Sequence, residues 1–326
     1  MSVPQELVDL IVHNVDDKSS FLSCCFTARS FVQPAQAQLY KNIEFLPPGS
    51  GDDSDPCEKF YNSLMSTPHL ATLVQELRIV SVVAQSSEDW NTRMGSSLIT
   101  DSQRTRSLSL ILPLLDLKRI SLVEDCPSEW VKCSLDWEQF DSPLRSALAT
   151  IFASPSLESA ELRGLRISSP PKLMSLFSEA ASLKSLSISR VRLQSLDDPT
   201  SWPASGPWKP QLANLFISAL RGDHFCEIFL DPRVDLSQVT SLHVASPGYA
   251  DWKTPISTPP ICPRLQKFAL MLPQADGIQS MPTTHLASLH LYVMYTADAL
   301  LQEVSDILIR PMNDCIKTDT RDEYLR

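Results

Sequence analysis

The sequence predicts an α/β fold in which short parallel strands alternate with helices and loops, preceded by a small all-α module. Three observations predict it. A six-residue apolar pattern recurs along the chain, segments of helical periodicity lie between several of its copies, and the N-terminal residues read as short helices. With 326 residues, 43% of them hydrophobic, the chain is long enough to bury an extended core.

The N-terminal residues 1–46 predict three helices and a strand-like end. Pro4 and Glu6 suit a first helical turn, and Leu7, Leu10 and Ile11 then mark an apolar face. A polar break follows at residues 16–19, so a second helix is expected over residues 21–31, capped by Ser19 or Ser20. A third short helix is expected over residues 34–40, before a strand-like stretch at residues 42–46.

The recurring pattern reads apolar-x-x-apolar-x-apolar, and its last three positions alternate as they do in a half-buried strand. Eight copies occur between Val74 and Leu291. They are Val74/Leu77/Ile79, Leu117/Ile120/Leu122, Leu157/Ala160/Leu162, Leu183/Leu186/Ile188, Leu212/Leu215/Ile217, Val239/Leu242/Val244, Leu265/Phe268/Leu270 and Leu286/Leu289/Leu291. Helical periodicity is expected over residues 58–65, 107–115, 144–152 and 173–181, each before a copy.

From the third copy onward, the first positions lie 26, 29, 27, 26 and 21 residues apart, close to the period of leucine-rich repeats. The prediction is therefore an irregular leucine-rich repeat solenoid, with parallel strands on the concave face and helices and loops outside. The two earlier gaps, of 43 and 40 residues, leave room for inserts, and no asparagine ladder follows the strands. Chance matches in a leucine-rich α/β chain are the alternative.

Side chains between the apolar anchors of each strand are expected to point to the concave, solvated face, because strand residues alternate between faces. Charged and aromatic groups there form a candidate surface for a protein target, and a merely solvated face is the alternative. The candidate target-binding residues are Arg78, Arg119, Glu161, Arg163, Phe216, His243, Lys267, His290 and Tyr292, with Glu76 beside them.

The N-terminal module resembles the F-box-like domains that precede degenerate leucine-rich repeats in many fungal proteins. Matching positions are Pro4, Glu6, Leu7, Ile11, Leu22, Cys24, Arg29, Ser30, Ala35 and Leu39, followed by Lys41-Asn42-Ile43. The run from Cys24 to Phe31 departs from the family pattern, since the family's second cysteine and its tryptophan are replaced by Ala28 and Phe31.

The resemblance implies a helical module that docks on the Skp-type adaptor of a cullin–RING ubiquitin ligase, while the repeats recruit a protein substrate. The residues implied in adaptor binding are Pro4, Leu7, Ile11, Leu22, Cys25, Arg29 and Phe31. The expected organisation is an F-box-like module at residues 1–46, a linker at 47–57, the repeat array at 58–309 and a polar tail at 310–326.

Composition excludes several other classes of function. A formal net charge of −10 without a dense Lys/Arg run argues against nucleic acid, and no apolar run reaches the ~18 residues that cross a bilayer. The eight cysteines are scattered in a chain without a secretory signal, so we expect reduced thiols and a cytoplasmic or nuclear protein. Clustered metal ligands, phosphate loops and nucleophile elbows are missing, so no cofactor, metal or catalytic residue is expected.

Two alternatives to a ligase subunit stay open at this stage. The F-box-like segment could have lost adaptor binding and serve only as a cap on the repeats of an interaction scaffold. A hydrolase site could instead lie in the Trp- and Cys-rich stretch from Glu124 to Phe140, which would require a deep pocket with convergent polar groups.

Overall fold

The computed structural model describes residues 3–46, 55–82, 102–125, 135–168, 170–193, 208–218, 234–245, 264, 266–272 and 288–293. The chain divides into two compact units. Unit 1 comprises Met1–Trp130 and Gln139–Leu157, and unit 2 comprises Val131–Glu138 and Glu158–Arg326. Both combine parallel strands with helices or loops, so the fold is α/β, as the sequence predicts. The end of the expected repeat array, the tail and most of the linker lie outside the described residues.

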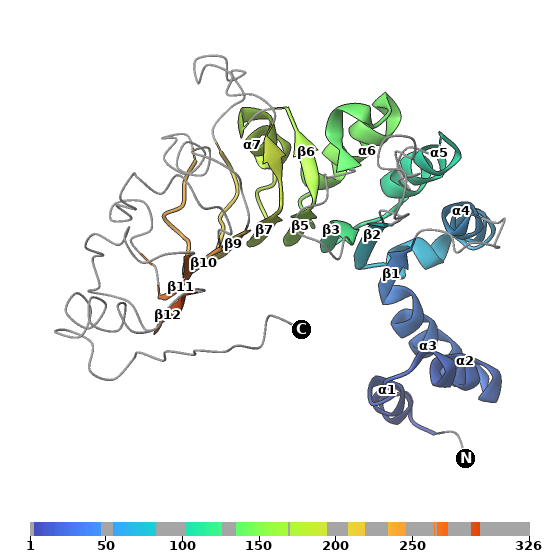
Figure 1. Cartoon of the computed structure of the whole chain (residues 1–326). Coiled ribbons are helices and arrows are strands. Elements are labelled where there is room, and N and C mark those ends of the chain that lie inside the picture. Colours follow the sequence, from blue (N-terminus) through green and yellow to red (C-terminus); the bar gives the residue numbers. More distant parts are fainter. Residues whose placement is uncertain are drawn as a thin grey trace, which may run out of the picture. The chain divides into compact units, whose positions relative to one another are not determined.

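Unit 1 begins with three helices, α1 (Gln5–His13), α2 (Lys18–Thr27) and α3 (Arg29–Lys41) (Figure 1). Both α1 and α2 pack against α3. The sequence prediction of one helix over residues 21–31 is wrong, because extended backbone at Ala28 separates α2 from α3. The expected serine cap is also wrong: Asp17 caps α2, accepting a hydrogen bond from the Ser20 N–H at 2.8 Å.

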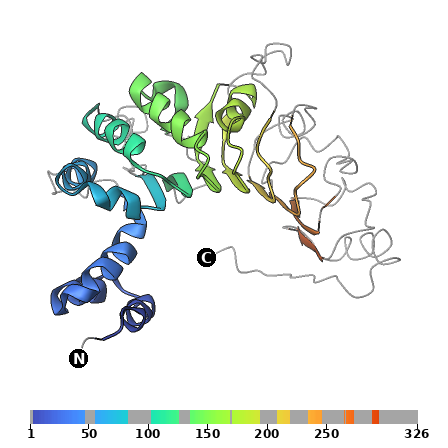
Figure 2. The ribbon, with the colours of Figure 1, turned by 180° about the vertical axis from the view of Figure 1, so that it is seen from behind.

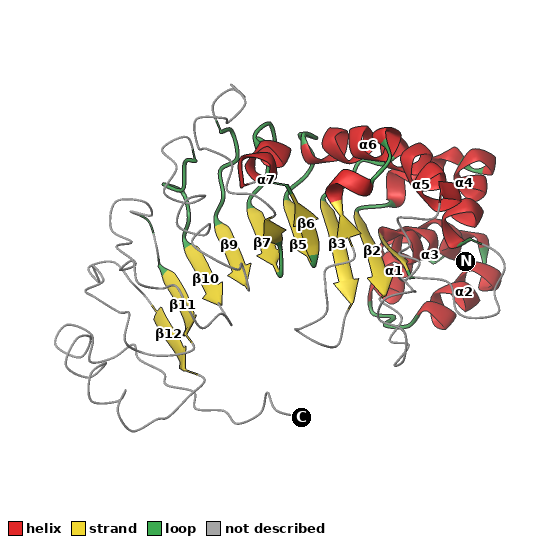
Figure 3. Cartoon of the chain, turned by 45° about the horizontal axis from the view of Figure 1, so that its top comes forward, coloured by secondary structure: helices red, strands yellow, loops and turns green. Residues whose placement is uncertain are grey.

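The rest of unit 1 places helices beside a parallel sheet in the order β1-β2-β3 (Figure 3). The strands are β1 (Asn42–Phe45), β2 (Glu76–Val82) and β3 (Arg119–Asp125). The helices are α4 (Pro56–Ser66), α5 (Ser102–Ile111) and α6 (Ser142–Phe152), with short 3₁₀ turns at Pro68–Leu73 and Leu112–Leu114. A further 3₁₀ turn, Trp137–Gln139, spans the sequence boundary between the two units. Asp141 caps α6 by accepting from the Leu144 N–H at 2.9 Å. The predicted helices around residues 58–65, 107–115 and 144–152 are thus confirmed.

The described part of unit 2 contains six parallel strands that neighbour one another in chain order. They are β5 (Ser159–Arg163), β7 (Ser185–Ser189), β9 (Asn214–Ser218), β10 (Ser241–Ala245), β11 (Lys267–Leu272) and β12 (Ser288–Val293). Their registers align equivalent positions of the apolar pattern, so that Leu186 pairs with Leu215 and Leu215 with Leu242. All eight strands predicted from the pattern are therefore present across the two units.

Burial alternates in β5, β7 and β9 as the sequence predicts, whereas Leu242 of β10 is only partly buried. Leu186 and Ile188 are buried in β7, whereas Ser185, Ser187 and Ser189 are partly exposed. Strands β2 and β3 depart from this alternation: β2 buries Ile79, Val80 and Ser81 in succession, and β3 buries every residue from Ile120 to Glu124. Of the side chains described in these two strands, only those of the first residues are therefore exposed to solvent.

A second, smaller parallel sheet in unit 2 escaped the sequence prediction. It runs in the order β4 (Leu135–Asp136), β6 (Leu165–Ile167), β8 (Arg192–Leu193). The chain enters β6 and β8 through equivalent turns, where Gly164 has φ 75° and Arg190 has φ 53°. The N–H of each donates to the last carbonyl of the next strand, at Ser189 and Ser218 respectively. After Phe177, which ends helix α7 (Pro170–Phe177), the chain turns back toward β7.

A repeated backbone interaction, here called the carbonyl ladder, joins the strand entries. The carbonyl just before one strand accepts hydrogen bonds from two N–H groups at the start of the next strand, over 2.8–3.0 Å. The carbonyls belong to Gln75 in unit 1 and to Glu158, Lys184, Ala213 and Thr240 in unit 2. The backbone N–H groups at these strand entries are therefore paired with other backbone groups.

Candidate functional site

The first candidate surface lies on the N-terminal helices (Figure 2, blue). Helix α1 buries Val8 and Val12, and it leaves Leu7, Leu10 and Ile11 at least half exposed. Every residue of α2 is described, and none of its side chains is fully buried. Leu22 is 50% exposed and Phe26 is 88% exposed, and they lie four residues apart on one helix face.

The residues that the F-box resemblance implies in adaptor binding are mostly accessible. Pro4, Leu7, Ile11, Leu22 and Arg29 are exposed, while Cys25 and Phe31 are partly buried. The resemblance missed Leu10 and Phe26. The signal that would have found Phe26 is the Leu22–Phe26 spacing, which places two large apolar side chains on one helical face.

Asp17 fixes the start of α2. Hydrogen bonds from the side chains and backbone of Ser19 and Ser20 lower the pKa of the Asp17 carboxyl to about 2. The carboxylate is therefore charged at neutral pH, and a negative charge at a helix N-terminus is favourable. The three described cysteines, Cys24, Cys25 and Cys57, form no disulfide.

The solvent-facing side of the strands in unit 1 is charged and internally paired. Arg78 Nε lies 3.5 Å from Glu44 Oε1, and Arg119 Nη1 lies 3.4 Å from Glu76 Oε2. Each pair joins neighbouring strands, and the side chains are largely exposed, so each contributes about 0–1 kcal/mol to stability. These arginines, which the sequence places on a binding face, already have partners.

The solvent-facing side of unit 2 differs in chemistry. Phe216 and His243 lie opposite each other on β9 and β10, with ring centroids 4.5 Å apart. Burial lowers the pKa of His243 below its ordinary value, which favours the neutral imidazole. Phe216 is partly buried by this contact, so its predicted exposure is only partial.

The remaining predicted target-binding residues surround this pair in the strand register. Glu161 and Arg163 on β5 are partly exposed, and Lys267 on β11 is exposed. His290 and Tyr292 lie on β12, and their side chains are outside what the structure describes. The structure therefore brings Phe216 and His243 into contact and leaves the other predicted residues of unit 2 on neighbouring strands.

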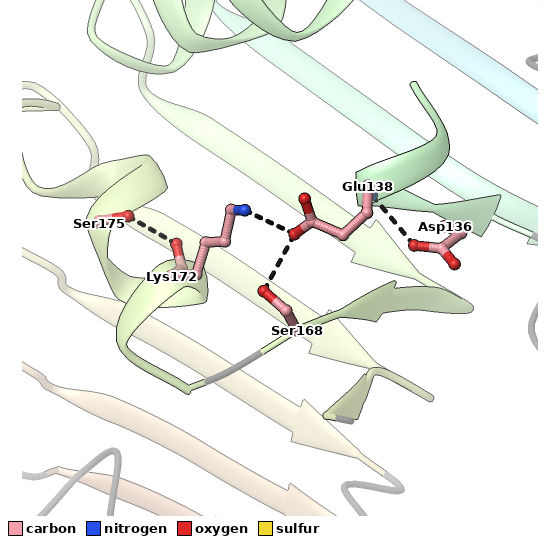
Figure 4. A network of polar contacts seen from close by, with 5 residues as sticks. All are labelled: Asp136, Glu138, Ser168, Lys172 and Ser175. Carbon is pink, nitrogen blue, oxygen red and sulfur yellow. Dashed lines mark hydrogen bonds and ion pairs between the residues drawn. The ribbon is translucent and has the colours of Figure 1, made fainter. Parts of the chain in front are cut away.

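A network of polar contacts occupies part of the stretch in which a hydrolase site was considered (Figure 4). Glu138 Oε1 accepts from Ser168 Oγ at 3.0 Å and lies 2.5 Å from Lys172 Nζ. The Glu138 N–H donates to Asp136 Oδ1 at 3.0 Å, and Arg166 Nε lies 3.4 Å from Asp136 Oδ2, near enough for an ion pair but without hydrogen-bond geometry. The contacts connect β4 to β6 and α7, which gives the network a structural role.

The hydrolase alternative depends on residues that are mostly not described. Trp130, Cys126 and Cys133 lie outside the described residues, whereas Trp137 and Phe140 are buried. Within the described ranges, no three His, Cys, Asp or Glu side chains are grouped to hold a metal ion. None of the described helices is long and apolar enough to cross a membrane.

Comparison with known proteins leaves the family open. No protein-family model matches the chain, and no curated protein matches it significantly in sequence. The functional argument therefore depends on the chemistry of the two surfaces.

Proposed function

We propose that this chain is a substrate-receptor subunit of a cullin–RING ubiquitin ligase that acts in the cytoplasm or nucleus. In this proposal, α1–α3 form an F-box-like module that binds a Skp-type adaptor. The strands form an irregular leucine-rich repeat solenoid whose concave face binds a protein target. The chain itself catalyses no reaction, and the ubiquitin-transfer chemistry belongs to its partners.

The observation that carries the proposal is the exposed apolar surface of α1 and α2. Leu7, Leu10, Ile11, Leu22 and Phe26 are half exposed or more on a module of two short helices packed against a third. Full burial of a fully exposed side chain of this size gains about 1.5–3 kcal/mol, so each half-exposed aliphatic residue would gain about half of that and Phe26 most of it. Helices that keep such residues in water are expected to bury them against a partner.

Backbone hydrogen bonding supports the repeat part of the proposal. The carbonyl ladder repeats at five strand entries, and the strands neighbour one another in chain order. Such nearest-neighbour stacking of similar units is the organisation of solenoid proteins. Solenoids commonly use the side chains along one strand face for binding.

Co-purification with a purified Skp-type adaptor tests the adaptor role. We expect wild type to bind, and we expect Phe26→Ser to weaken binding by about 2 kcal/mol, or about thirtyfold. Leu7→Asp combined with Ile11→Asp should abolish binding. Met65→Asp is the matched control, because Met65 is a similarly exposed apolar residue on α4 and should not affect the adaptor.

Two results would contradict the ligase proposal. The first is that the wild-type protein fails to bind the adaptor. The second is that the Leu7/Ile11 double variant binds it as tightly as wild type does. Circular dichroism of each variant establishes that the helices remain folded, so that a loss of binding is attributable to the surface.

A non-ligase interaction scaffold is the second candidate, and one observation favours it. The module is continuous with the sheet: α3 leads directly into β1, which pairs with β2, and the Gln75 N–H donates to the Lys41 carbonyl at 2.9 Å. This arrangement suits a cap on the first strand. Under this alternative, the double variant would leave all partner binding unchanged.

A further inference from the structure

A window of eight uncharged side chains occupies the solvent-facing side of three neighbouring strands in unit 2. We define the β7–β10 window as Ser185, Ser187, Ser189, Asn214, Phe216, Ser218, Ser241 and His243. All are at least partly exposed. Charged residues bound it in the strand register, with Glu161 and Arg163 on β5 and Lys267 on β11.

The window contrasts with the strand face of unit 1, where the charges pair across strands. In the part of the chain that the structure describes, no hydrogen bond or ion pair engages the window's side chains, and the contact between Phe216 and His243 is a ring contact. Its hydroxyl and amide groups can therefore donate to and accept from a ligand.

Phe216 and His243 are the two large side chains of the window, and small hydroxyl residues surround them. Ser187 pairs with Phe216 in the strand register, and Ser218 follows Phe216 two residues later on the same face. A rigid aromatic pair among small neighbours gives an incoming side chain an apolar surface to contact. Aromatic residues in such central positions commonly dominate binding energy.

The chemistry of the window limits what it can bind. A charged ligand group would lose hydration without meeting an opposite charge among these eight residues, which disfavours charged segments. The three strands span two inter-strand spacings, about 10 Å, which is the length of roughly three residues of extended chain. The free backbone groups of an extended segment match the serine hydroxyls and the Asn214 amide.

We propose that the β7–β10 window binds a short, uncharged, extended segment of the target protein that places a large apolar or aromatic side chain against Phe216 and His243. This inference deepens the target-receptor role proposed above and rests on it. It names the class of target segment that this receptor would select.

Selection from a phage-displayed library of short random peptides tests the proposal with the full chain immobilised. We expect wild type to enrich peptides without charged residues around a Phe, Tyr, Trp or Leu. A synthetic copy of the enriched peptide should bind Phe216→Ser at least about tenfold more weakly in fluorescence polarisation. Ser187→Asp places a charge in the window without removing an aromatic side chain, and it should weaken binding similarly.

Phe26→Ser provides the matched control, since it is the same substitution at an exposed phenylalanine of the helical module. It should keep peptide binding and weaken adaptor binding about thirtyfold, whereas Phe216→Ser should weaken peptide binding and keep adaptor binding. Adaptor binding without peptide binding would refute the window alone. Peptide binding without adaptor binding would refute the ligase role and leave the window standing.

Four results would overturn the inference. Wild type would enrich acidic or basic peptides, or enrich none, or the chosen peptide would bind Ser187→Asp as tightly as wild type. A dimer in light scattering that Phe216→Ser dissociates would also overturn it, because the occupant would then be a second copy of the chain. If Phe216→Ser does not fold, Ser187→Asp decides the outcome.

Discussion

His243 links the strand face to pH. Burial lowers its pKa from the ordinary 6.5, so the folded protein resists a proton that the unfolded chain accepts. The associated stability is fully present above pH 6.5 and is lost as pH falls from there to the folded pKa. We expect the free energy of unfolding, measured with denaturant, to decrease below pH 6.5 more steeply in wild type than in His243→Gln. Equal pH slopes in the two proteins would contradict this role.

Gly164 and Arg190 occupy equivalent turns with positive φ, and they offer a paired test of backbone strain. A side chain at such a position costs about 1 kcal/mol or more, because Cβ approaches the following carbonyl. We expect Gly164→Ala to lower the free energy of unfolding by about 1 kcal/mol. Arg190→Gly should relieve strain and change stability in the opposite direction or not at all. Thermal melts of both variants measure the change in stability relative to wild type. Equal losses of stability in the two variants would argue against backbone strain at Arg190.

Strand β7 shows how an element of this fold is stabilised. Leu186 is buried on one face, while Ser187 faces solvent on the other. We expect Leu186→Ala to cost about 2–5 kcal/mol, because it removes buried apolar contacts and leaves a cavity. Ser187→Ala should change the free energy of unfolding by about 0.5 kcal/mol or less. Denaturant unfolding of the two variants measures both changes. Similar losses in the free energy of unfolding would contradict this packing.

The strands could be predicted from sequence because each carries the apolar pattern, and from the third copy onward a regular spacing agrees with it. Apolar anchors such as Leu186 and Ile188 alternate with serines, and similar spacings separate the copies. The boundary between α2 and α3 could not be predicted from sequence, because nothing in the run of small and apolar residues around Ala28 indicates an extended residue. The second sheet was missed for another reason: strands such as Arg192–Leu193 are too short for periodicity to be read.

The candidate surfaces were predicted only in part. Alternation placed Phe216 and His243 on the solvent-facing side, but their contact depends on the register between β9 and β10, which no local pattern states. Phe26 was missed because family positions guided the choice of residues on α2. Its exposure follows from how α2 packs against α3, which is a property of tertiary structure.

At the scale of the whole molecule, the two surfaces lie in different compact units, so their binding should be separable. We expect a Skp-type adaptor to slow backbone hydrogen exchange in residues 5–41 and a window-binding peptide to slow it in strands β7, β9 and β10. Hydrogen exchange with mass spectrometry, with each ligand added alone, measures both effects. Protection of both regions by either ligand would contradict independent surfaces.

The carbonyl ladder has a consequence for how this chain can change over evolution. Its donors and acceptors are all main-chain atoms, so strand entry places no requirement on the side chains at Glu158, Lys184 or Ala213. Substitutions at these turns, and insertions between them, therefore leave the hydrogen bonds of the carbonyl ladder in place. Strands joined this way can diverge in sequence, and the segments between them in length, while the strand pairing persists. Recognition of distant relatives should therefore depend on backbone pairing more than on residue identity.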